Sequence, residues 1–153
     1  MSQENVEIVR AAYENWNTGD MVSLREMYDP DAMLVRGLEG WPETFPIVGR
    51  EAVMAYFEQL RETWDSDNVE TVSLDDAGDS VVVRTIWRGV GHGPDLNLEW
   101  SVVCTLRRGR IFFLEYFWDH AEALEAVGLS AEHDARADSP NTARSSRGAP
   151  REP

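Results

Sequence analysis

The chain is 153 residues long, and its 14 basic side chains are all arginines, set against 28 aspartates and glutamates for a formal net charge of -14. The lack of lysine excludes chemistry that needs a lysine amine, such as a Schiff base or a P-loop. The negative charge disfavours partners that are themselves anionic, namely nucleic acid and anionic membrane surfaces.

The length is typical of one domain with a sizeable core. Residues 130–153 hold no apolar side chain other than alanine and proline, and this composition predicts a disordered tail after a single domain over residues 1–129. We expect a cytoplasmic protein, because the first residues lack a secretory signal pattern and Cys104, the only cysteine, has no partner for an intrachain disulfide. No apolar stretch approaches the length that spans a bilayer.

Apolar residues of the first half recur at helical spacing, with glycine and proline marking the breaks. The predicted elements are a helix from about Val6 to Asn17, a short helix over Met21–Met27, a strand over Ala32–Arg36, a loop from Gly37 to Gly49 that carries Trp41, and a helix over Arg50–Trp64.

From Val69 onward apolar and polar residues alternate, which is typical of strands joined by tight turns. The predicted elements are strands over Val69–Leu74, Ser80–Val90, Asp95–Arg107 and Arg110–Trp118, followed by a helix over His120–Val127. Helices followed by an antiparallel meander predict an α+β fold.

Alternation also divides the last three strands into two faces. The more apolar set is expected to face the helices: Val82, Arg84, Ile86, Arg88, Leu98, Trp100, Val102, Cys104, Phe112, Leu114, Tyr116 and Trp118. The opposite set still carries Trp87, Ile111, Phe113 and Phe117, a large apolar patch for a monomer. We therefore expect a homodimer through the sheet face.

This orientation places Arg84 and Arg88 in an apolar interior, where an unpaired charge is unfavourable. They either pair with acids or reach solvent at the rim, or else they meet a ligand at a pocket mouth. With the register reversed, Glu99 and Glu115 would point inward instead as a carboxylate pair.

Three stretches of the chain, in this order and spacing, resemble the SnoaL-like branch of the nuclear-transport-factor-2-like superfamily. They are VRAAYENWNTGDMVSL at residues 9–24, GREAVMAYFEQL at residues 49–60 and RGRIFFLEYFWDHAEALEAVGL at residues 108–129. The resemblance implies a curved sheet wrapped by helices into a cone around a deep apolar pocket. Family members include isomerases, dehydratases, cyclases, epoxide hydrolases and proteins that only bind or scaffold, so the fold does not fix the function.

The resemblance also bears on catalytic residues. The Arg and Asp of limonene-epoxide hydrolases fall at Ile86 and Arg88, and their second Asp, like the acid/base Asp of SnoaL-type cyclases, falls at Tyr116. None of these residues is kept, which argues against both mechanisms. Tyr116 remains a candidate hydrogen-bond donor to a developing oxyanion.

The aromatic residues expected to line the pocket are Tyr13, Trp16, Trp41, Phe57, Trp100, Tyr116 and Trp118. The alternative is that these rings simply fill the cone as a core. His92, in the glycine-rich hairpin, is a candidate catalytic residue near the pocket mouth or else a solvated turn residue.

Two further residues have structural interpretations. The family resemblance makes Asp119 a catalytic candidate, but Asp119 and Glu122 before an apolar helix favour a helix cap. Cys104 is expected to be a small core residue. The three histidines show no metal-ligand spacing, and we expect neither a metal nor a cofactor.

Two functional hypotheses follow. The first is a cofactor-free isomerase, cyclase or lyase acting on a small apolar or aromatic ligand, with Tyr116 as donor and Arg84 or Arg88 orienting a polar group. The second is a ligand-binding or interaction module without catalysis.

Overall fold

The computed structural model describes residues 2–36, 38–40 and 45–129. The first half of the chain forms α1 (Ser2–Thr18), α2 (Met21–Glu26), β1 (Tyr28–Arg36), β2 (Ile47–Val48) and α3 (Arg50–Glu62). The second half forms β3 (Ser66–Ala77), β4 (Ser80–Val90), β5 (Leu96–Arg107), β6 (Arg110–Phe117) and α4 (His120–Ala126). The expected elements are present, whereas the tail over residues 130–153 and Trp41 lie outside the described residues.

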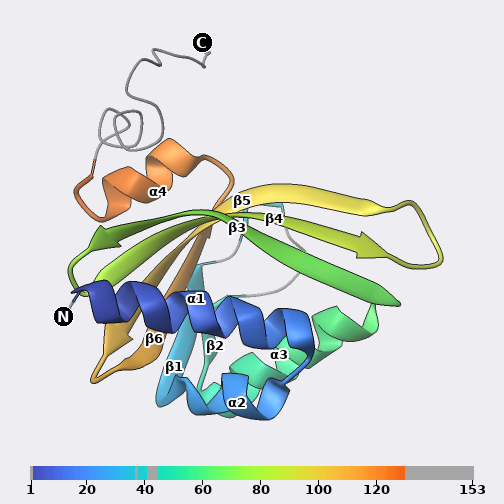
Figure 1. The fold of residues 1–153 in the computed structure, drawn as a ribbon, viewed down its shortest axis with the longest axis horizontal. Coiled ribbons are helices and arrows are strands. Elements are labelled where there is room, and N and C mark those ends of the chain that lie inside the picture. The colour runs from blue at the N-terminus through green and yellow to red at the C-terminus, as the bar shows by residue number, and fades with distance from the viewer. Residues whose placement is uncertain (1, 37, 41–44, 130–153) are drawn as a thin grey trace.

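The strands form one curved sheet in the order β2-β1-β6-β5-β4-β3. Strands β3 to β6 are the expected antiparallel meander, while β1 adds to the edge of β6 in parallel. Figure 1 shows α1, α2 and α3 on one side of the sheet and α4 on the other. The result is the α+β cone with a short C-terminal helix that the sequence predicts.

Each face of the sheet has its own core. The larger core lies between the sheet and helices α1 to α3 and includes Val9, Val53 and Val102, all fully buried. The smaller core lies beneath α4, where Leu124 packs with Val82, Val103 and Phe117. The helix α4 therefore covers part of the outer sheet face.

Strand β4 faces the opposite way from the expected orientation. Val81, Val83 and Trp87 belong to the larger core, whereas Arg84 and Arg88 lie on the outer face. The pairing of β4 with β5 sets this orientation, because directly paired residues share a face. Val83 pairs with Val102 and Trp87 with Leu98, whereas Arg84 pairs with Ser101. The expected inward position of Val82, Arg84, Ile86 and Arg88 is therefore wrong.

The apolar patch from which we predicted a dimer is largely buried within the single chain. Trp87 and Ile111 lie in the larger core at 3% and 1% exposure, and Phe117 lies beneath α4. Only Phe113 of that group is partly exposed. The dimer stays a prediction, but it rests on less apolar surface.

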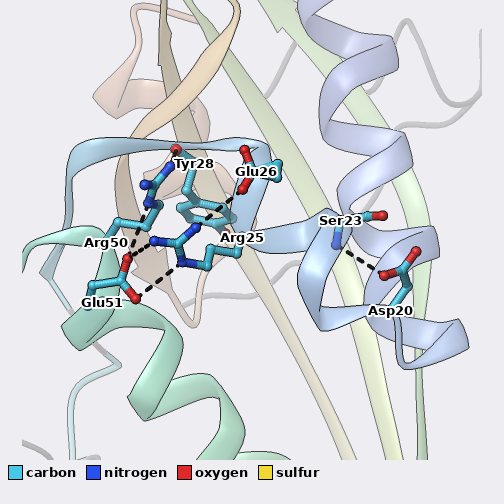
Figure 2. A network of polar contacts seen from close by, with 7 residues as sticks. All are labelled: Asp20, Ser23, Arg25, Glu26, Tyr28, Arg50 and Glu51. Carbon is cyan, nitrogen blue, oxygen red and sulfur yellow. Dashed lines mark hydrogen bonds and ion pairs between the residues drawn. The ribbon is translucent and has the colours of Figure 1, made fainter.

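A polar network joins α2, β1 and α3 at one corner of the molecule (Figure 2). Arg25 pairs with Glu51 across the two helices, and Arg50 donates from Nη1 to the backbone oxygen of Tyr28 at 3.2 Å. The side chain of Asp20 caps α2 by accepting from the backbone N–H of Ser23. Arg50 thereby fixes the start of β1, where Tyr28 enters the core.

No helix within the described ranges is long and apolar enough to cross a membrane.

Candidate functional site

A cavity of about 80 Å³ lies inside the cone, between the helices and the inner face of the sheet. One water needs roughly 10–15 Å³ on the same measure, so the cavity has room for a small organic molecule. Its described lining is apolar or aromatic, with no charged side chain, and includes the four tyrosines of the chain: Tyr13, Tyr28, Tyr56 and Tyr116.

The tyrosines reach the cavity from different elements. Tyr13 lies on α1 one helical turn before Trp16, Tyr28 opens β1, and Tyr116 is near the end of β6. Tyr116 pairs with Val102 of the buried inner face, which directs its ring toward the helices. Tertiary packing therefore gathers phenols that are far apart in the sequence.

Three of the phenol hydroxyls have no hydrogen-bond partner among the described residues. They belong to Tyr13, Tyr28 and Tyr116, whereas many other buried polar groups of the structure are paired. Burial raises the pKa of each of these phenols well above its ordinary value, and the nearby Cys104 raises it further. At neutral pH all three are protonated and serve as hydrogen-bond donors.

Cys104 lies among these phenols on the inner face of β5, with 2% of its surface exposed. Burial raises the pKa of its thiol to about 12. The side chain is therefore a neutral thiol and a poor nucleophile at neutral pH, because the thiolate is the reactive form. This agrees with its expected role as a small core residue.

Two indoles that line the cavity turn their N–H groups away from it. Trp16 on α1 and Trp87 on β4 each donate from Nε1 to the same oxygen, Oδ2 of Asp67, at 2.7 Å. The carboxylate of Asp67 does not line the cavity, and its side chain is only 5% exposed. Asp67 thus holds two walls of the cavity together.

The structure places most of the predicted aromatic set at the cavity. Its described lining includes Tyr13, Trp16, Phe57, Trp100 and Tyr116. Trp118 is not among them, since β6 ends at Phe117. The Trp118 ring is 45% exposed and donates to the backbone oxygen of Glu39 at 2.9 Å.

The polar candidates lie elsewhere. Arg84 pairs with Glu99 at 2.8 Å and Arg88 with Glu70 at 2.9 Å, both on the outer face of the sheet. His92 is exposed in the turn between β4 and β5, and it does not line the cavity. Arg84, Arg88 and His92 therefore do not line the described cavity.

Sequence reasoning missed four residues of this region. Tyr28 and Tyr56 line the cavity but were not among the residues predicted to line it, and Trp87 was placed on the wrong face of β4. Asp67 was missed because the predicted strand began two residues later, at Val69. Asp67 lies two residues before Val69, so extending the predicted strand back to it would have placed both side chains on the same face.

A separate polar cluster lies under α4. Ser101 and Nδ1 of His120 are hydrogen-bonded at 2.6 Å, and Nε2 of His120 lies 3.8 Å from Oδ2 of Asp75. All three residues are largely buried. Asp119 caps α4 by accepting from the backbone N–H of Ala121 at 2.9 Å, which confirms the cap interpretation. These residues hold α4 on the sheet.

Within the part of the chain that the structure describes, no group of three His, Cys, Asp or Glu side chains is arranged to hold a metal ion.

The fold and the cavity define an α+β cone with an uncharged, aromatic interior site. The sequence model of the SnoaL-like domain matches residues 9–114, and the chain belongs to this family. No curated protein matches the chain.

Solved structures share the fold. Bal32a from a soil-derived mobile gene cassette is 22% identical, with a TM-score of 0.69 over 75% of this chain and 88% of its own. TerC co-crystallised with polyporic acid is 19% identical, with a TM-score of 0.66 over 81% of this chain and 98% of its own. A protein of ketosteroid isomerase-like fold from Catenulispora acidiphila DSM 44928, in complex with trimethylamine, is 19% identical, with a TM-score of 0.63 over 82% of this chain and 95% of its own.

Proposed function

We propose that the protein binds a small, neutral, largely apolar or aromatic molecule in the cavity and receives an accepting oxygen of that molecule at the phenols of Tyr13, Tyr28 and Tyr116. The observation that carries this proposal is the group of three phenol donors in the cavity lining, of which Tyr28 is buried and Tyr13 and Tyr116 are partly buried, without a hydrogen-bond partner among the described residues. A hydrogen bond from such a hydroxyl to a ligand oxygen contributes about 0.5–1.5 kcal/mol, so a ligand with an accepting oxygen gains affinity. The uncharged lining favours a neutral molecule, because a buried charge needs a partner.

The test compares acetophenone with cumene, which has nearly the same shape but no oxygen. Calorimetry or quenching of tryptophan fluorescence measures both affinities for the wild type and for Tyr13→Phe, Tyr28→Phe and Tyr116→Phe. Each hydroxyl that contacts the ketone is worth about three- to tenfold in affinity for acetophenone. Cumene affinity should not change. Equal binding of the two ligands by the wild type, or no effect of any variant, would contradict the proposal.

A second candidate is a cofactor-free isomerase, cyclase or lyase. Phenol donors that reach a carbonyl oxygen also stabilise the negative charge that develops on it during enolisation, and the presence of three such donors in one cavity lining favours this candidate. Binding alone has more support, because the described lining holds no carboxylate or imidazole to take the proton. Burial raises the pKa of the phenols of Tyr13, Tyr28 and Tyr116 and of the Cys104 thiol, so these groups stay protonated at neutral pH and are poor bases.

Proton exchange separates the two candidates. In heavy water an enzyme of this kind would speed deuterium incorporation into the methyl group of bound acetophenone, and NMR measures this directly. A binding module leaves exchange at the buffer rate. The Tyr116→Phe variant is the control, because acceleration that survives it does not come from this donor.

We further propose that two copies associate through the part of the outer sheet face that α4 leaves uncovered. That face retains the partly exposed Ile86 and Phe113 beside the ion pairs of Arg84 and Arg88. Light scattering that finds a stable monomer at micromolar concentration would contradict this.

The free thiol of Cys104 suits a reducing compartment such as the cytoplasm.

A further inference from the structure

The buried carboxylate of Asp67 occupies a junction of three elements. Asp67 lies near the start of β3 and pairs with Gly89 of β4, two residues beyond Trp87 on the inner face. The side chain reaches α1 through Trp16 and α3 through Arg61. Its place in the fold is directly behind the cavity wall rather than in it.

Both indole contacts of Asp67 use one oxygen. Trp16 and Trp87 donate to Oδ2 at 2.7 Å each, which is the short distance typical of a bond to an ionised acceptor. Since an indole has a single donor, neither ring retains an N–H for a ligand. Both rings line the cavity, and they therefore present carbon atoms to it.

Arg61 completes the junction from α3. Its Nη1 lies 3.8 Å from Oδ1 of Asp67 and donates to the backbone oxygen of Trp16 at 2.8 Å, while the guanidinium lies 5.0 Å from the centre of the Trp16 ring. A buried carboxylate persists when it is paired in this way. The pairing keeps Asp67 turned toward the indoles.

The cavity consequently has two chemically different ends. Trp100 separates the ring of Trp87 from that of Tyr116, with ring centres 5.5 and 6.0 Å apart along this row. Phe57 separates Trp16 from Tyr28 in the same way, at 5.8 and 5.9 Å. Phenol donors lie at the end of the cavity formed by Tyr28 and Tyr116. At the other end, the indole N–H groups of Trp16 and Trp87 are bound to Asp67 and are not available to a ligand.

We propose that Asp67 is a positioning residue that determines specificity: by holding the N–H groups of Trp16 and Trp87, it restricts the site to molecules with an accepting oxygen at one end and an apolar group at the other. This inference rests on the proposed binding function. It goes further by assigning the polarity of the ligand and the residue that sets it.

Two ligands of matched shape test the assignment. The first is 4-isopropylacetophenone, with one accepting oxygen, and the second is 1,4-diacetylbenzene, with one at each end. The wild type should prefer the first by about tenfold, since the second buries a carbonyl against indole carbon. In Asp67→Ala the freed indole N–H groups can turn toward the cavity and donate to that carbonyl, and the preference should fall to about onefold or invert.

Two variants serve as controls. Asp67→Asn keeps an accepting oxygen and should retain most of the wild-type preference. Asp65→Ala removes an exposed carboxylate two residues away and should retain all of it. A preference that survives in Asp67→Ala overturns the inference, whereas a wild type that binds neither ligand overturns the proposed function instead.

A measurement on the wild type covers the case in which Asp67→Ala does not fold. Proton–nitrogen NMR resolves the indole N–H signals, and Trp16→Phe and Trp87→Phe assign the two in question. Both signals should exchange slowly with solvent and barely shift when 4-isopropylacetophenone binds. Fast exchange, or a large shift of either signal toward that of a new hydrogen bond, overturns the inference.

Discussion

Replacing Tyr116 by phenylalanine should leave the free energy of unfolding unchanged or raise it by up to about 1 kcal/mol. The hydroxyl lies in the cavity lining with no partner among the described residues, so the native state loses no hydrogen bond when it is removed. The hydroxyl oxygen is not completely buried, so water in the cavity can solvate it, and its removal raises the free energy of unfolding by no more than about 1 kcal/mol. Removal of an ordinary, hydrogen-bonded buried hydroxyl lowers the free energy of unfolding instead.

Thr85 provides the comparison. Its side chain is fully buried, and its hydroxyl donates to the backbone oxygen of Trp100 at 3.2 Å. Thr85→Val removes that bond while keeping the shape, and should lower the free energy of unfolding by about 1 kcal/mol. Urea denaturation measures both variants, with equal slopes required for the comparison. If Tyr116→Phe lowers stability as much as Thr85→Val does, its hydroxyl is a structural bond and the ligand interpretation fails.

Three other variants test the packing and the charges elsewhere in the fold. Gly89→Ala should destabilise the fold by about 1–3 kcal/mol, seen as a lower urea midpoint, because the new Cβ would lie 2.9 Å from Cδ2 of Trp64. Asp119→Ala should cost about 1 kcal/mol, read from thermal unfolding, by removing the cap of α4. The hydrogen bond from Arg107 holds the pKa of Asp29 below its usual range, so this pair stabilises the fold above about pH 4 and ceases to do so as pH falls through the lowered value. Asp29→Asn should therefore flatten the acid limb of the stability profile measured by urea denaturation from pH 2 to 6.

Each of these variants has its own control. Gly93→Ala adds a Cβ in open space and should leave the urea midpoint unchanged. An equal drop in both variants would mean that the loss at Gly89 comes from chain flexibility and not from the contact with Trp64. Asp119→Ser restores a capping oxygen and should recover most of the lost stability; no recovery would mean that the charge, not the cap, matters. Arg107→Ala should flatten the same acid limb as Asp29→Asn, and an unaltered limb in either variant contradicts the assigned pair.

The sequence predicts the fold better than it predicts the faces of the sheet. The range Ser80–Val90 was predicted as a strand with its observed bounds, yet its orientation was wrong. Pooling three strands into two faces hid a local signal: Val81, Val83 and Trp87 carry no charge, whereas Arg84 and Arg88 share the other face. If the faces of β4 had been assigned separately from those of β5 and β6, the unfavourable burial of two arginines would have predicted the observed orientation.

The site was harder to predict because it depends on contacts between distant segments. Tyr13 and Tyr116 were expected at the pocket from the resemblance and from the strand pattern, and they line the cavity. Tyr28 joins them only because Arg50 holds the start of β1. The role of Asp67 depends on two indoles that lie 51 and 20 residues from it in the chain, and periodicity does not encode such a contact.

The distribution of charge supports a neutral ligand independently of the phenols. Arginines on several elements are paired with acids outside the cavity: Arg25 with Glu51, Arg61 with Asp67, Arg84 with Glu99, Arg88 with Glu70 and Arg107 with Asp29. In a chain with twice as many acidic as basic residues, the remaining carboxylates give the exterior a negative field. That field repels an anion before it reaches the cone, and the uncharged lining offers a cation no counter-charge once inside. A molecule without charge meets neither obstacle, and the buried phenols can then hold its oxygen.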